Sequence, residues 1–283
     1  ALDYGKQYLS IMLIGLIFFA INQSYVNTIR ETGHTLIPMV ASMVAVFTNL
    51  VLDYCLIFGK LGFPEMGIGG AALASFCAEV SAFIFFTTYS YITLKDKEFG
   101  MFKMHKLESE LMGRILKVAT PTMIQKLFSF GVWFVFFILI EKMGETATGI
   151  SSIVRSIYMI LITPCFAFST TTNTLVSRII GEGETNQVFS TISKVLKNSL
   201  LCTIPIVVFV AAFPTQIAGI YTDDMDFAKL VVPSILMICS GTIFQCIGNA
   251  YFEAVSGTGN TTAALYLEAV ILVIYILFII AMT

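Results

Sequence analysis

Charged residues are scarce in this 283-residue sequence: Asp, Glu, Lys and Arg together account for only 12% of it, whereas 57% of the residues are hydrophobic. Soluble domains carry about 25% charged residues, so this balance excludes an ordinary water-soluble domain and indicates a protein whose solvent is lipid. The formal net charge of −2 is also too small to suggest a nucleic-acid partner.

Residue types that commonly carry out chemistry are few as well. The only two histidines, His34 and His105, fall in predicted loops, and the chain contains no HExxH, GxSxG or Walker pattern. The six cysteines stand singly in apolar runs, without a CxxC pair or a metal-ligand spacing. This distribution is typical of small buried side chains. The sequence therefore argues against an intramembrane enzyme and predicts no bound metal or cofactor.

Long apolar runs, in contrast, are abundant. A helix needs about 20 apolar residues to cross a bilayer, and eight stretches are long enough. They span residues 8–29, 36–58, 68–94, 115–140, 147–179, 195–220, 230–255 and 262–282. We therefore predict an all-α, multi-pass membrane protein with about eight transmembrane helices.

The Lys and Arg residues of the connections predict the orientation. The longest connection, near residues 95–117, carries six of them, and alternate connections on the same side carry more. The opposite set holds only Lys60, Lys142 and Lys229, and it includes an acidic turn at Asp224. The positive-inside rule therefore places the 95–117 connection in the cytoplasm. The alternative is that this basic loop binds a partner.

One short sequence occurs twice, as NQSYVNTIRETGHT at residues 22–35 and as GNAYFEAVSGTGNT at residues 248–261. At a constant offset the identical pairs are Tyr25 and Tyr251, Thr32 and Thr258, Gly33 and Gly259, and Thr35 and Thr261. Six predicted spans separate the two turns, which returns the chain to the same membrane face. We therefore infer two parallel six-helix repeats, a construction common among transporters. The alternative is that small and polar residues recur in any tight turn.

Four segments resemble the multidrug and toxic compound extrusion (MATE) transporters. In chain order they are TIRETGHTLIPM at residues 28–39, NLVLDYCLIFGKLGFPEMGIGGAALAS at 49–75, ATPTMIQ through KMGETATG at 119–149, and TLVSRIIGEGETNQ at 174–187. Each segment alone is degenerate, but their order and spacing are typical of this family. The resemblance implies a twelve-helix fold with two six-helix lobes around a central cleft.

By this resemblance the eight spans are helices four to eleven of twelve, so about three N-terminal helices and the last helix lie outside this sequence. Residues 1–94 would form the second half of the N-lobe, residues 95–112 the cytoplasmic inter-lobe loop, and residues 113–283 most of the C-lobe.

The implied activity is alternating-access export of cationic or amphipathic organic compounds in exchange for H⁺ or Na⁺. The protein would lie in the cell (inner or plasma) membrane as a monomer. Its partners would be a small organic substrate and the lipid bilayer.

Asp53 is the strongest candidate for the ion-coupling site. An ionisable side chain inside a span costs several kcal/mol unless it is paired or faces water, so it marks a function by default. Asn49 lies one helical turn earlier, so the two side chains share a face. At 1.5 Å per residue, Asp53 lies about 26 Å from Leu36, in the outer half of the membrane, where burial favours its protonated form. The alternative is a helix-end carboxylate that reaches the outer interface.

The NxxxD pattern of Asn49 and Asp53 resembles the proton-linked N-lobe site of the MATE branch related to the DNA-damage-inducible transporters. The resemblance also carries over Tyr8 in the preceding helix and Ser75 in GAALAS. The sodium-linked branch places a carboxylate about two turns after a proline in its seventh helix. The matching position here is Ser129, which weakens a sodium mechanism.

Five other ionisable residues fall inside the predicted spans: Glu79, Lys126, Arg155, Glu253 and Glu268. Mutual pairing is the simplest structural account, for example Lys126 with Glu253 or with Glu268. Glu253 is also near enough to a turn for its carboxylate to reach the interface.

Two further functions compete with the exporter. A flippase for lipid-linked sugars, in the same superfamily, would need a strongly cationic cavity, whereas the intramembrane charges here are mixed. A purely structural subunit would not explain Asp53 or the duplicated turn. The sequence therefore favours an ion-coupled, and specifically a proton-coupled, exporter.

Overall fold

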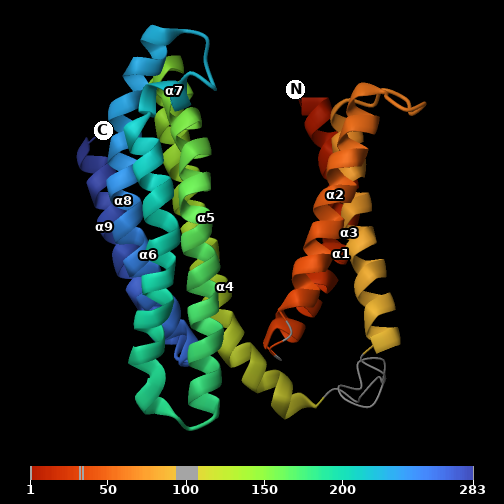
Figure 1. Ribbon diagram of the computed structural model, residues 1–283, viewed down its shortest axis with the longest axis vertical. Coiled ribbons are helices and arrows are strands. Elements are labelled where there is room, and N and C mark those ends of the chain that lie inside the picture. The colour runs from red at the N-terminus through yellow and green to blue at the C-terminus, as the bar shows by residue number, and fades with distance from the viewer. Residues whose placement is uncertain (1, 32, 34, 94–107, 283) are drawn as a thin grey trace. The chain divides into compact units, whose positions relative to one another are not determined.

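The computed structural model describes residues 2–31, 33, 35–93 and 108–282, and every element longer than five residues in these ranges is an α-helix (Figure 1). Eight helices of the described ranges are long and apolar enough to cross a membrane, which confirms the predicted fold class. The chain divides into two compact units, residues 1–106 and 107–283.

Unit 1 consists of three helices: α1 Leu2–Glu31, α2 Leu36–Phe58 and α3 Ile68–Thr93. Helix α3 packs against both α1 and α2, which make few contacts with each other. Phe86 of α3 is only 1% exposed and lies in a cluster with Ile29 and Ile37. Because lipid tails are as apolar as these side chains, close packing rather than transfer from water stabilises the contact.

Two glycines set the close approach of α2 and α3. Gly59 ends α2 in the left-handed conformation, at φ 62°, which a residue with a Cβ rarely adopts. Gly70 lies against the backbone of α2, where a Cβ would come within 2.6 Å of the Leu56 carbonyl oxygen. This contact between backbones brings polar side chains farther along the two helices within reach of each other.

Unit 2 contains five long helices: α4 Ser109–Lys142, α5 Glu145–Gly181, α6 Val188–Ala212, α8 Met225–Gly257 and α9 Thr261–Met282. Two short elements, the 3₁₀ turn η1 Thr185–Gln187 and α7 Pro214–Ala218, flank α6. Helices α5, α6 and α8 pack closely around a core that includes Leu161 and Ile235, both fully buried. Helices α4 and α9 pair mainly with each other.

The two copies of the repeated sequence form turns with the same backbone conformation. Gly33, between α1 and α2, has φ 90°, and Gly259, between α8 and α9, has φ 80°. The Gly33 amide donates to the Arg30 carbonyl at 3.0 Å, and the Gly259 amide donates to the Ser256 carbonyl at 3.0 Å. The same bond occurs at other turns of the described chain, for example from the Gly183 amide to the Ile180 carbonyl at 3.1 Å, so the duplication stays a prediction from the sequence.

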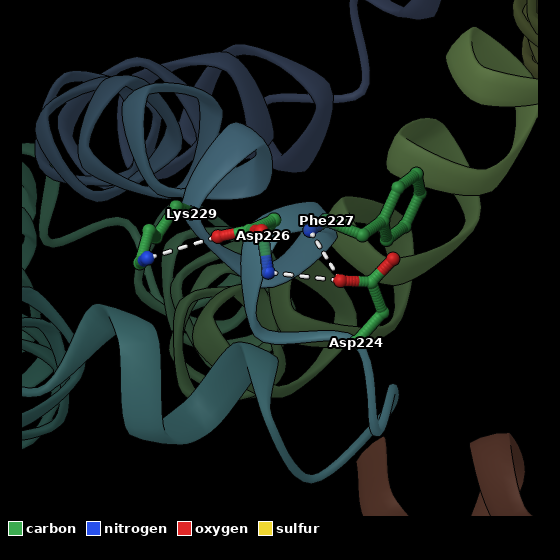
Figure 2. Close-up of polar contacts among 4 residues, drawn as sticks. All are labelled: Asp224, Asp226, Phe227 and Lys229. Atoms are coloured by element: carbon green, nitrogen blue, oxygen red, sulfur yellow. Dashed lines mark hydrogen bonds and ion pairs between the residues drawn. The ribbon is translucent and has the colours of Figure 1, made fainter.

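A side-chain cap fixes the start of α8. The Asp224 carboxylate accepts hydrogen bonds from the amides of Asp226 at 2.9 Å and Phe227 at 3.2 Å, and the Lys229 ammonium pairs with Asp226 at 3.0 Å (Figure 2). The Phe227 ring in turn packs on Gly149 of α5, where a Cβ would lie 2.9 Å from the ring. The cap therefore also positions a contact between α5 and α8.

The predicted inter-lobe loop, residues 95–112, lies mostly outside the described residues. Its last four residues differ from the prediction, because α4 already begins at Ser109. The first turn of α4 contains Glu110, which pairs with Arg114 one turn later. Such a pair stabilises an exposed helix turn, so α4 extends beyond the apolar stretch that marked the span.

Candidate functional site

The predicted coupling residues of unit 1 lie on all three of its helices. Asn49 and Asp53 are one turn apart on α2, Ser75 is on α3, and Tyr8 is on α1. The Asn49 side-chain amide donates to the Ser75 hydroxyl oxygen at 3.4 Å. The structure therefore brings Asn49 and Ser75 together, across the contact that Gly70 permits.

Asp53 lies beside this hydrogen bond and is half-buried. Its Oδ1 atom is buried and has no hydrogen-bond partner in the described part of the chain. A buried carboxylate oxygen without a donor is costly inside an apolar helix, so this arrangement marks Asp53 as a functional candidate. Tyr8 is half-buried and forms no hydrogen bond to Asp53 or Asn49 among the residues described.

A second acid of unit 1, Glu79, is held by Asn22, which the sequence analysis did not single out. The Asn22 side-chain amide donates to the Glu79 carboxylate and to the Glu79 carbonyl, both at 2.8 Å, and so joins α1 to α3. Asn22 is only 5% exposed. An amide in the middle of an apolar run was the available signal, but the sequence does not show that α3 supplies its partner.

Unit 2 contains a cavity of about 330 Å³ between α4, α5, α8 and α9. Its lining is mainly polar: Val118, Thr122, Gln125, Lys126, Asn173, Ser177, Glu253, Ser256, Gly259 and Thr261. Gln125 is 2% exposed, and its side-chain oxygen has no partner among the described residues. The cavity therefore combines buried acceptor oxygens with one carboxylate and one ammonium.

The two acids inside the predicted spans of unit 2 accept hydrogen bonds from neutral groups. The Asn173 amide donates to the Glu253 carboxylate at 2.9 Å, and the Ser129 hydroxyl donates to the Glu268 carboxylate at 2.5 Å. Lys126 lines the same cavity as Glu253, but it forms no ion pair with a described residue. The structure thus does not join Lys126 to Glu253 or Glu268 in the pairs suggested by the sequence.

Arg155 of α5 has a different environment. Its guanidinium carbon lies 5.0 Å from the ring centre of Phe137 on α4, a contact worth about 0.5–1 kcal/mol at an exposed site. The side chain is exposed and forms no ion pair within the described ranges. Arg155 is therefore separate from the polar cavity and from both acids.

Comparison with known proteins places these features in a family. The profile of the family described as MatE matches residues 1–55 and 121–280. A probable multidrug resistance protein NorM from Thermotoga maritima is 31% identical over 259 residues, which cover 91% of this chain and 55% of that protein. The chain spans about half the length of the curated relatives it matches.

Solved structures show the same fold. An outward-facing multidrug resistance MATE transporter of the MOP superfamily superposes with a TM-score of 0.82 at 20% identity, over 93% of this chain and 58% of that one. A MATE protein in complex with MaL6 superposes with a TM-score of 0.81, also at 20% identity, over 93% and 58% of the two chains.

Proposed function

The chain belongs to the MatE family of multi-pass membrane transporters, which are not enzymes, and from this premise we propose that the protein is a proton-coupled antiporter that exports small organic compounds. Its place would be the cell (inner or plasma) membrane, where it would act as a monomer. The description of the Thermotoga relative as a probable multidrug resistance protein supports the export of organic compounds.

The observation that carries this proposal is the environment of Asp53. It is the only charged residue of α2, and one of its carboxylate oxygens is buried without a donor in the described chain. At this depth an uncharged residue would cost less free energy to bury than a carboxylate, so the presence of the acid indicates a function. Binding of a proton removes the charge and supplies the donor that the carboxyl group lacks.

A titrating Asp53 can couple proton movement to transport if the two access states hold its proton with different affinity. A proton that binds when the site is open to the outside and leaves when it is open to the inside biases the exchange between these states. Asn49, fixed by Ser75 at 3.4 Å, would orient the α2 face on which Asp53 lies without carrying a proton itself.

The test replaces Asp53 with Asn, which has a similar volume and cannot titrate. In proteoliposomes with matched protein incorporation, we expect Asp53→Asn to reduce pH-gradient-driven dye efflux to the level of empty vesicles. The control is Asp223→Asn, which makes the same chemical change in an exposed turn and should retain wild-type efflux. Wild-type efflux by Asp53→Asn would remove Asp53 from the mechanism.

Sodium coupling is the second candidate, because a carboxylate from another helix lies at the position where the sequence itself has no acid. Ser129 occupies the position at which the sodium-linked branch carries an acid, and it binds Glu268 of α9. The same vesicles should therefore be tested with a sodium gradient at equal pH. Efflux driven by sodium but not by protons, and lost in Glu268→Gln, would favour this candidate over the proton.

A further inference from the structure

Arg155 lies over one ring of an aromatic cluster that α4 and α5 form together. The ring centres of Trp133 and Phe137 are 5.5 Å apart, and those of Trp133 and Tyr158 are 6.4 Å apart. Arg155 lies over the Phe137 ring at 5.0 Å. All four residues belong to unit 2, so the cluster is formed within one compact part of the chain.

A hydrogen bond holds one residue of the cluster, and two other side chains of it are exposed. The Tyr158 hydroxyl donates to the Gln245 side-chain oxygen at 2.7 Å, which ties the cluster to α8. Trp133 remains 39% exposed, so part of its indole can contact a ligand. The guanidinium of Arg155 is exposed, and no hydrogen bond or ion pair to a described residue uses its five N–H groups.

An exposed, unpaired guanidinium is unusual at this depth. Arg155 is ten residues from the start of α5, or about 15 Å along the helix, within a segment long and apolar enough to span the membrane. Charged side chains in spans face the protein interior or a water-filled cavity rather than lipid. By this principle the face of α4 and α5 that carries Arg155 is expected to lie toward the protein interior or a water-filled cavity, not toward lipid.

We propose that Arg155 and Trp133 form a binding site for a small aromatic carboxylate. A guanidinium presents paired N–H donors that match the two oxygens of a carboxylate, and the neighbouring aromatic rings offer stacking surfaces for a planar ligand. This inference rests on the proposed export function, for which it names the substrate class. It differs from the cationic class expected from the family resemblance, because a guanidinium at this position repels a cation.

The chain carries a built-in probe of this site, because Trp133 is its only tryptophan. Purified protein in lipid nanodiscs is titrated with 4-nitrobenzoate, which quenches indole fluorescence, and in parallel with 4-nitrobenzamide, its uncharged counterpart. We expect saturable quenching by the carboxylate at a half-saturating concentration at least about tenfold below that of the amide, the range expected for a hydrogen bond to a charged group.

Two substitutions assign the preference to Arg155. Arg155→Gln should remove the difference between the two probes, and Arg155→Lys should retain only part of it, since an ammonium lacks the paired donors. The control is Lys142→Gln, which removes one positive charge from the exposed end of α4 and should bind both probes as the wild type does.

Equal quenching of the wild-type protein by both probes would overturn the inference, and no variant is needed to see it. This result is expected if another part of the chain neutralises the charge of Arg155. An unchanged carboxylate preference in Arg155→Gln would overturn it as well. Because binding is measured without an ion gradient, its result is independent of Asp53. If the protein shows no preference for the carboxylate but still performs proton-driven efflux, the binding site is wrong and the export proposal stands. If it binds the carboxylate but performs no efflux, the export proposal is wrong.

Discussion

Three acids inside the apolar helices, unlike Asp53, are held by neutral donors. The pairs are Glu79 with Asn22, Glu253 with Asn173, and Glu268 with Ser129. A neutral donor lowers the cost of burying a carboxylate without cancelling its charge. Each of these acids can therefore still respond electrostatically to a proton, an ion or a ligand, whereas an acid already paired with Lys or Arg responds less.

Substitution of Asn49 tests how much of the proposed proton coupling depends on the orientation of the Asp53 site. Asn49→Ala removes the 3.4 Å hydrogen bond to Ser75 but leaves the Asp53 carboxyl group in place. We expect proton-driven efflux to fall severalfold rather than to the level of empty vesicles. The measurement is the same dye efflux, with Asp53→Asn run beside it. An Asn49→Ala protein as inactive as Asp53→Asn would show that Asn49 does more than orient the site.

The sequence identified most of the charged candidates but not their partners. Glu79, Glu253 and Glu268 stood out because a charge inside an apolar run is conspicuous. Their partners did not, because Asn22 lies 57 residues from Glu79 and Ser129 lies 139 residues from Glu268. Helices that are apolar on all sides carry no stripe that marks which face meets which neighbour. The hydrogen-bonded pairs that join such helices therefore cannot be predicted from the sequence and are seen only in the packed structure.

At the scale of the helix, close packing of α5 and α8 depends on Gly257. A Cβ at this position would lie 2.7 Å from the Asn173 carbonyl oxygen, which belongs to the backbone and cannot rotate away. We expect Gly257→Ala to destabilise the protein by about 1–3 kcal/mol, as overpacking does elsewhere. Thermal unfolding followed by exposure of buried cysteines to a thiol-reactive dye would measure the change.

The matched control lies on the same helix. A Cβ added at Gly248 would meet no atom within 4 Å among the described residues, so Gly248→Ala should be neutral or slightly stabilising because Ala favours helix by about 1 kcal/mol. Equal destabilisation by both substitutions would mean that contact with α5 is not the cause.

The cap of α8 gives a second prediction at this scale. Asp224→Ala removes both hydrogen bonds to the first-turn amides shown in Figure 2 and should cost about 1 kcal/mol. Hydrogen–deuterium exchange should increase at the amides of Asp226 and Phe227 and stay unchanged in the middle of α8. Asp223→Ala, whose side chain accepts no hydrogen bond from a described residue, should leave this exchange unaltered.

The number and approximate positions of the spans were predictable because hydropathy indicates which segments can lie in lipid. The helix ends were less so: α6 spans Val188–Ala212, whereas the predicted span was 195–220. The start of α4 at Ser109 was missed because its first turn is held by Glu110 and Arg114, which carry no hydropathic signal. A span predicted from apolar residues therefore ends where lipid ends, whereas the helix itself continues into water.

At the scale of the whole molecule, the distribution of Lys and Arg predicts which ends of the helices face the cytoplasm. Single cysteines at positions 105 and 186 should react with a membrane-impermeant reagent added from the cytoplasmic side. Cysteines at positions 60, 145 and 224 should react only from the outside. Reaction of both groups from one side would contradict the eight-span arrangement.

The native cysteines suit this experiment. Four of the six are buried, Cys77 is half-buried and Cys202 is exposed, so Cys202→Ser provides a background of low reactivity. Residual labelling of that background from either side sets the threshold that each introduced cysteine must exceed.

The uneven packing of unit 2 has a mechanical consequence. Helices α5 and α8 approach each other backbone to backbone at Gly257, so we expect them to move together. Helices α4 and α9 hold each other more firmly than they hold α5 and α8. The polar cavity lies between the α4–α9 pair and the α5–α8 pair. A small rotation of α4 and α9 would widen or compress it. We therefore expect the space around Glu253 to change in volume when α4 and α9 move against α5 and α8.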